Sequence, residues 1–94
     1  MFKTLEELIA VIRQRKESST KESYTNKLLN NKKLSAGKAK EEIAELIDAI
    51  EKDTNKVHEA ADVLYHLMVL LEANGIKIED VMEELKKRQN DKLA

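Results

Sequence analysis

Cysteine and proline are absent from the 94 residues, glycine occurs twice, and aromatic residues make up only 3%. Without cysteine, the chain can form neither a disulfide-stabilised scaffold nor a thiolate zinc site. So few turn-forming and aromatic residues exclude a β-sandwich or barrel, which needs a turn signal about every ten residues. We therefore expect an all-α fold, a bundle of four to five helices forming one domain over residues 1–94.

Long hydrophobic runs and an excess of one charge are lacking as well. The longest apolar run, residues 63–71, is nine residues long, whereas a membrane-spanning helix needs about 20. The formal net charge of −1 provides no general attraction to nucleic acid or to a membrane surface. The first residues enter an amphipathic pattern directly, without the features of a secretory signal. We expect a cytoplasmic protein with no nucleic-acid or membrane partner.

The hydrophobic residues recur at helical spacing along most of the chain. The pattern predicts helices at about residues 4–16, 23–29, 35–52, 55–74 and 78–89. Gly75 is predicted to end the fourth helix in a left-handed conformation. The inner face of the third helix is predicted to consist of Ala39, Ile43, Leu46, Ile47 and Ile50.

The middle of the fourth helix is apolar on nearly all sides, so it must be covered on several sides. A chain of this length buries only a modest part of its unfolded surface, which makes a stable fold harder to reach alone. Both observations favour association with further copies of the chain, as a homodimer or a dimer of dimers.

Two pairs of carboxylates stand out on the third and fourth helices. Glu42 and Glu45 are three residues apart, as are Glu59 and Asp62, so each pair lies on one face of its helix. Antiparallel packing of the two helices would bring all four together. A cluster of oxygen ligands suits Mg²⁺ or Mn²⁺. Salt bridges to lysines are the alternative use of these groups.

Charge is divided sharply between two neighbouring segments. Residues 27–40 contain five lysines and no acid, whereas residues 41–53 contain six acids and one lysine. This arrangement suits a ligand made of a cation and a phosphate, which needs both signs of charge side by side. A solvated helix face next to a basic loop is the alternative interpretation.

Glu41, Glu42 and Glu45 are followed, thirteen residues after Glu45, by Glu59 and Asp62. This carboxylate motif resembles that of the all-α nucleotide pyrophosphohydrolases. Three further stretches are similar to the phosphoribosyl-ATP pyrophosphatase branch: residues 23–29 (SYTNKLL), 59–67 (EAADVLYHL) and 75–81 (GIKIEDV). The resemblance extends from the first helix to about Arg88.

The resemblance implies a role for each matching residue. The Mg²⁺ ligands would be Glu42, Glu45, Glu59 and Asp62, with Mn²⁺ as a possible substitute. Glu41 would be an accessory ligand or the base that orients the attacking water, and Lys38 would contact phosphate. The remaining substrate-binding candidates are Ser23, Tyr24, Thr25 and Lys27.

The activity implied is the hydrolysis of phosphoribosyl-ATP, a small-molecule nucleotide, to phosphoribosyl-AMP and pyrophosphate in histidine biosynthesis. The chain departs from the family pattern at Lys27, where arginine is frequent, and at Lys40, where glycine is frequent. A related pyrophosphohydrolase acting on ordinary or damaged (d)NTPs and a non-catalytic helical dimerisation module are the alternatives.

His66 is interpreted as a core histidine or as a partner of Asp62. The absence of cysteine leaves no ligands for the zinc-binding cyclohydrolase often fused to this family, so we expect a single-function enzyme.

Overall fold

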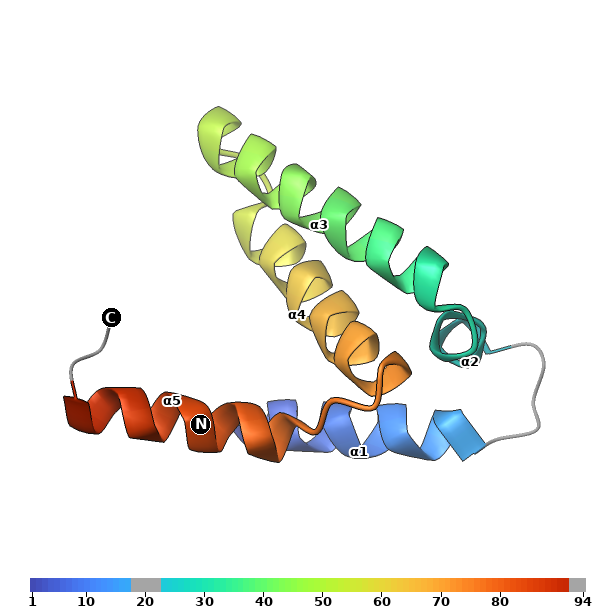
Figure 1. Cartoon of the computed structure of the whole chain (residues 1–94). Helices are drawn as coiled ribbons and strands as arrows, with labels where there is room; N and C mark the ends of the chain where they lie inside the picture. The colour runs from blue at the N-terminus through green and yellow to red at the C-terminus, as the bar shows by residue number, and fades with distance from the viewer. Residues whose placement is uncertain (18–22, 92–94) are drawn as a thin grey trace.

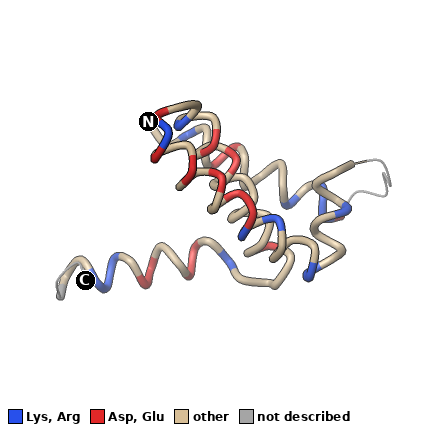
Figure 2. Tube along the Cα trace, turned by 90° about the horizontal axis from the view of Figure 1, so that it is seen from above, with Lys and Arg blue, Asp and Glu red and all other residues tan. Residues whose placement is uncertain are grey.

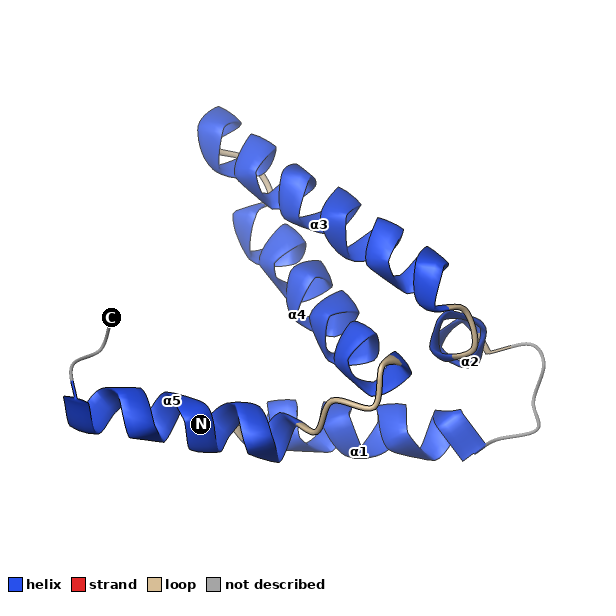
Figure 3. Ribbon diagram, viewed as in Figure 1, coloured by secondary structure: helices blue, strands red, loops and turns tan. Residues whose placement is uncertain are grey.

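Five helices make up the computed structural model, which describes residues 1–17 and 23–91. No strand is present within those two ranges, so the predicted all-α class is confirmed (Figure 3). The helices are α1 (Lys3–Glu17), α2 (Tyr24–Leu29), α3 (Lys32–Lys52), α4 (Lys56–Ala73) and α5 (Ile78–Asp91). The described residues include no helix long and apolar enough to span a membrane.

Side-chain caps fix the starts of α2 and α3. The Ser23 hydroxyl accepts a hydrogen bond from the backbone N–H of Asn26 at 3.2 Å, and the Asn31 side chain accepts one from the N–H of Leu34 at 3.0 Å. Such caps satisfy backbone donors that have no partner inside the helix. Because Asn31 is a cap, α3 begins at Lys32, three residues earlier than predicted, and residues 32 and 33 belong to the helix.

The helices α3 and α4 form an antiparallel hairpin, the most extensive helix pair in the fold (Figure 1). The turn between them places Asp53 and Asn55 in the left-handed region, with φ of 56° and 44°. Aspartate and asparagine tolerate that region better than most residues. Gly75 after α4 also has positive φ, 69°, which confirms the predicted helix end.

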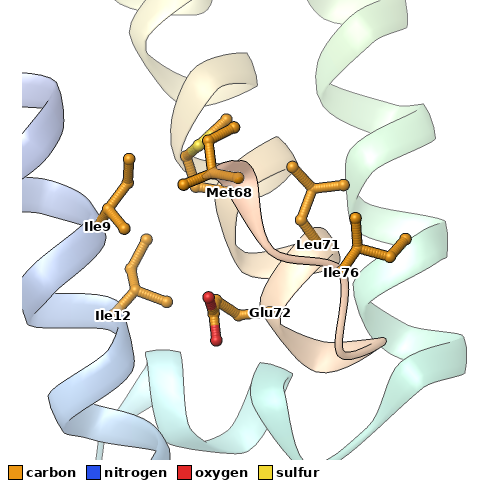
Figure 4. A pocket seen from close by; sticks show the side chains of 7 residues that line it. Ile9, Ile12, Met68, Leu71, Glu72 and Ile76 are labelled. Atoms are coloured by element: carbon orange, nitrogen blue, oxygen red, sulfur yellow. The ribbon is translucent and has the colours of Figure 1, made fainter. Parts of the chain in front are cut away.

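The core lies where α1, α2 and α4 meet, at one end of the hairpin. Its buried members are Ile12, Leu28, Leu29, Met68, Val69 and Ala73. Figure 4 shows Ile9 and Ile12 of α1 facing Met68 and Leu71 of α4 across a small pocket that Glu72 also lines. Burial of the five larger side chains contributes roughly 1.5–3 kcal/mol each, so this cluster anchors α2 and the base of the hairpin.

The predicted inner face of α3 is right for Ala39, which is buried, and for Leu46, which is partly buried, but wrong for the three isoleucines in this structure of one chain. Ile43, Ile47 and Ile50 are 48%, 52% and 56% exposed, whereas the buried residues of α3 are Ser35, Ala39 and Ala49. Small side chains allow the helices to approach closely, so the packed side of α3 carries serine and alanine and the isoleucines lie outside. Leu64 and Leu67 of α4 are exposed too, at 47% and 39%.

An ion-pair cluster holds α5 against the rest of the chain. Arg13 of α1 donates from Nε to Glu72 of α4 at 2.9 Å, and its two terminal nitrogens donate to Glu79 of α5 at 2.9 and 2.6 Å. The hydrogen bond to Arg13 lowers the pKa of Glu79 to about 2. We call this ion-pair cluster of Arg13, Glu72 and Glu79 the clasp. Beyond the clasp, α5 runs away from the other helices (Figure 2).

Candidate metal centre

The four predicted metal ligands lie on the facing helices of the hairpin, where acidic residues gather (Figure 2). The structure divides them into two overlapping groups. Carboxylate oxygens of Glu42, Glu45 and Glu59 lie within 4.8 Å of one another, and so do single ligand atoms of His58, Glu59 and Asp62. Glu59 belongs to both groups, so it links the acidic pair of α3 to that of α4.

Two of these carboxylates have oxygens that are buried and have no hydrogen-bond partner among the described residues: Glu42 Oε2 and Glu59 Oε2. The Glu42 side chain is only 14% exposed. Burial raises the pKa of Glu42, and the neighbouring charge of Glu45 raises it further. A buried carboxylate without a partner is costly, so the group is suited to a cation that the chain itself does not supply.

Within residues 1–17 and 23–91, no lysine or arginine forms an ion pair with Glu42, Glu45, Glu59 or Asp62. The alternative in which lysines neutralise this cluster is therefore not what the structure shows. Oxygen donors that are not paired with cationic side chains fit a hard divalent ion such as Mg²⁺.

His66 is buried beside Glu42, with Nε2 at 3.9 Å from Glu42 Oε1. The rings of Tyr24 and Tyr65 contact it edge-on, with centroids 6.2 and 5.0 Å away. Burial lowers the pKa of His66, which favours the neutral imidazole. The structure thus shows a core histidine next to the acidic cluster, and the carboxylate that its Nε2 approaches is Glu42, not Asp62 as one interpretation had it.

A cationic groove adjoins the carboxylates on the N-terminal half of α3. Lys38 Nζ lies 3.4 Å from Glu41 Oε2, and the hydrogen bond with Glu41 raises the pKa of Lys38. Glu41 lies outside both ligand groups. The groove is lined by Asn31, Lys33, Leu34, Gly37, Lys38 and Glu41.

The predicted substrate-binding residues of α2 are only partly available to a ligand. The hydroxyl of Ser23 caps α2, and that of Thr25 is hydrogen-bonded to the hydroxyl of Tyr65. Tyr24 is 49% exposed and Lys27 is exposed. The hydroxyls of Ser23 and Thr25 are therefore engaged within the protein, whereas the side chains of Tyr24 and Lys27 are exposed to solvent.

His58 is a candidate site residue that the sequence analysis missed. Its Nε2 lies 3.4 Å from Asp62 Oδ2, one helical turn further along α4. The spacing of four residues between His58 and Asp62, with Glu59 beside them, is the sequence signal that could have identified it.

Comparison with known proteins gives a consistent assignment, although no solved structure matches the chain. Residues 5–89 match the family described as phosphoribosyl-ATP pyrophosphohydrolase. The chain is 43% identical over 93 residues to the phosphoribosyl-ATP pyrophosphatase of Methylobacterium nodulans, covering 90% of this chain and 82% of that protein. It is 41% identical over 88 residues to the protein of that name from Allorhizobium ampelinum, covering 90% and 85%.

A longer relative contains the same region. The chloroplastic histidine biosynthesis bifunctional protein of Arabidopsis thaliana is 46% identical over 94 residues, which is 90% of this chain and 33% of that protein. The chain thus spans about a third of the bifunctional protein and most of the two bacterial pyrophosphatases. With a family match over nearly its whole length, the chain belongs to the phosphoribosyl-ATP pyrophosphohydrolase family, a family of hydrolases.

Proposed function

We propose that the protein hydrolyses phosphoribosyl-ATP to phosphoribosyl-AMP and pyrophosphate, the reaction of histidine biosynthesis, with Mg²⁺ held by Glu42, Glu45, Glu59 and Asp62. The observation that carries the metal part is the pair of buried oxygens on Glu42 and Glu59 that have no hydrogen-bond partner within residues 1–17 and 23–91. The family match and the names of the relatives support the substrate. Mn²⁺, which takes similar oxygen ligands, is the natural substitute.

The chain's own residues then have distinct tasks. When bound, Mg²⁺ neutralises phosphate charge and lowers the pKa of the attacking water. Glu41, which directly precedes Glu42 in α3 and lies outside both ligand groups, orients that water for attack between the α- and β-phosphates. Lys38 and Lys33, which line the groove beside Glu41, hold the leaving pyrophosphate. The neutral His66 packs beside Glu42 and limits the positions available to that carboxylate.

The proposal includes a homodimer. The chain exposes 7300 Å², whereas a compact monomer of its mass is expected to expose about 5,500 Å². Its radius of gyration is 14.7 Å, against about 13 Å for a compact chain of 100 residues. The exposed stripe of Ile43, Ile47 and Ile50 on α3 offers apolar surface for a second copy, and a standard interface needs about 800 Å² per partner.

A substrate panel tests the activity. Pyrophosphate release from phosphoribosyl-ATP is measured with Mg²⁺, with Mn²⁺ and with a chelator, and is compared with release from a series of dNTPs. We expect the highest kcat/KM with phosphoribosyl-ATP and none in the chelator. Faster turnover of any dNTP would overturn the substrate assignment. Full activity in the chelator would overturn the metal assignment.

Oligomeric state is tested separately by light scattering on a sizing column. We expect twice the chain mass for the wild type and a smaller species for Ile47→Asp, because a charge would then lie within the apolar interface. Glu51→Gln, an exposed substitution on the same helix, is the matched control. A wild-type mass of one chain would exclude the homodimer.

The cytoplasmic location stays a prediction, since one relative is named as chloroplastic.

A further inference from the structure

The metal centre contains a nitrogen donor that the four-carboxylate assignment leaves out. His58 lies in the first turn of α4, and its Nε2 is 3.4 Å from Asp62 Oδ2. One ligand atom each from His58, Glu59 and Asp62 falls within 4.8 Å of the others. Two donor atoms bound to one Zn²⁺ at about 2.0–2.2 Å lie at most about 4.4 Å apart, so small side-chain movements would bring these three atoms to a shared cation.

An ordinary ion pair explains this geometry less well. A hydrogen bond from a nitrogen to an oxygen is usually 2.7–3.2 Å long, and the His58–Asp62 distance is longer. Exposed ion pairs one helical turn apart contribute little to stability. Neither residue therefore gains much from the other, and both remain able to turn a donor atom toward a third group.

Glu59 provides an independent observation. It belongs to the His58 group and to the all-oxygen group with Glu42 and Glu45, and its Oε2 is buried without a hydrogen-bond partner among the described residues. Glu59 thus lies beside two possible sets of ligands, and one of its oxygens accepts no hydrogen bond from the described residues. Such a carboxylate is suited to bridge two neighbouring cation positions.

The two positions differ in chemistry. Glu42, Glu45 and Glu59 offer oxygen only, which suits Mg²⁺. His58, Glu59 and Asp62 offer one imidazole nitrogen with two carboxylates, and imidazole favours borderline first-row ions such as Zn²⁺ or Co²⁺ over Mg²⁺. We propose that His58, Glu59 and Asp62 form a second, mixed nitrogen–oxygen cation position that selects Zn²⁺ or Co²⁺ over Mg²⁺. The proposal rests on the metal-dependent function above and refines it: Asp62 belongs to the second position, and Glu42, Glu45 and Glu59 hold Mg²⁺ at the first.

The test uses the full chain labelled with ¹⁵N-histidine and titrated with Zn²⁺ and, separately, with Mg²⁺. Because the chain has only two histidines, the two imidazole systems can be assigned in NMR spectra by comparison with His58→Gln. We expect Zn²⁺ to shift the Nε2 resonance of His58 strongly and Mg²⁺ to leave it nearly unchanged.

Affinities give the second readout. Calorimetry on His58→Gln should show Zn²⁺ binding weakened by on the order of tenfold and Mg²⁺ binding changed by less than about twofold. Circular dichroism should show the helix content of the wild type, because His58 is exposed. Glu51→Gln serves as the control for a change of surface charge.

The outcomes separate this inference from the proposed function. If Glu45→Gln weakens Mg²⁺ binding but the His58 resonance does not move with Zn²⁺ and His58→Gln binds Zn²⁺ normally, the mixed position is excluded and the carboxylate site stands. If the wild type binds neither ion, both proposals are overturned. If His58→Gln weakens Mg²⁺ and Zn²⁺ equally, the claim of selectivity is wrong.

Discussion

Glu42 and Glu72 are almost equally buried, with side chains 14% and 15% exposed, yet their surroundings are opposite. Glu72 lies at the base of the hairpin and receives a hydrogen bond from Arg13 at 2.9 Å. Glu42 lies among other carboxylates, and no lysine or arginine of the described residues pairs with it.

The contrast shows that this chain neutralises a largely buried carboxylate with its own arginine where structure alone is required. At the hairpin it does not, and burial and Glu45 raise the pKa of Glu42 instead. The fold keeps carboxylates that repel one another close together, so a cation bound from solution would relieve their repulsion. The predictions below test whether the two carboxylate clusters differ in this way.

The largest effect is expected from removing charge at the hairpin. The double variant Glu45→Gln, Asp62→Asn should lower the rate of pyrophosphate release on the order of 100-fold or more, because metal-held charge supplies several kcal/mol of transition-state stabilisation. Without metal its melting temperature should equal or exceed that of the wild type, since fewer carboxylates repel one another. A lower melting temperature with retained activity would make the cluster structural.

Removing the adjacent cation should have a smaller effect. Lys38→Gln should raise KM for phosphoribosyl-ATP about tenfold, as expected for the loss of one charge-assisted contact to phosphate, and leave Mg²⁺ affinity almost unchanged. Initial-rate kinetics and calorimetry provide the two numbers. An unchanged KM would place the substrate phosphates outside the groove of α3.

At the clasp, the expected result is reversed. Arg13→Gln leaves Glu72 and Glu79 without their guanidinium partner, so the melting temperature should fall by a few degrees while Mg²⁺ affinity stays that of the wild type. Thermal unfolding followed by circular dichroism, with and without Mg²⁺, measures both. A change in Mg²⁺ affinity would mean that the clasp and the metal centre are coupled.

The smallest effect concerns the dependence of stability on pH. The pKa of Glu79 is lowered from 4.5 to about 2 by Arg13, so its contribution to stability is complete above pH 4.5 and is lost as the pH falls toward 2. Glu79→Gln should therefore be less stable than the wild type at neutral pH, and the difference should disappear near pH 2. Urea unfolding across this range measures it; a constant difference would contradict the assigned pKa.

Local patterns in the sequence predicted the helices and the carboxylate pairs, because helical spacing and caps are properties of neighbouring residues. The start of α3 was predicted too late because Asn31 was interpreted as part of a loop when its side chain caps the helix. Contacts between distant residues left no such pattern. Arg13 is 59 residues from Glu72 and 66 from Glu79, so the clasp was not predicted.

The exposed side of α3 could not be predicted from one chain's periodicity. The pattern shows that Ile43, Ile47 and Ile50 share a face, but it does not show whether that face meets α4 or solvent. The structure packs α3 through its small residues Ser35, Ala39 and Ala49. The roles predicted for the site residues stay predictions, which the variants above are designed to test.

The turn at residues 53–55 determines where the chain can change in length. Thirteen residues separate Glu45 from Glu59: seven complete α3, three form the turn and three begin α4. An extra residue within either helical portion would rotate one carboxylate pair by about 100° relative to the other, whereas an extra residue in the turn need not rotate either pair. Over evolutionary time, insertions between the two motifs should therefore accumulate in the turn or arrive as whole helical turns. A single alanine added after Glu51, compared with one added after Thr54, would show this as a difference in Mg²⁺ affinity.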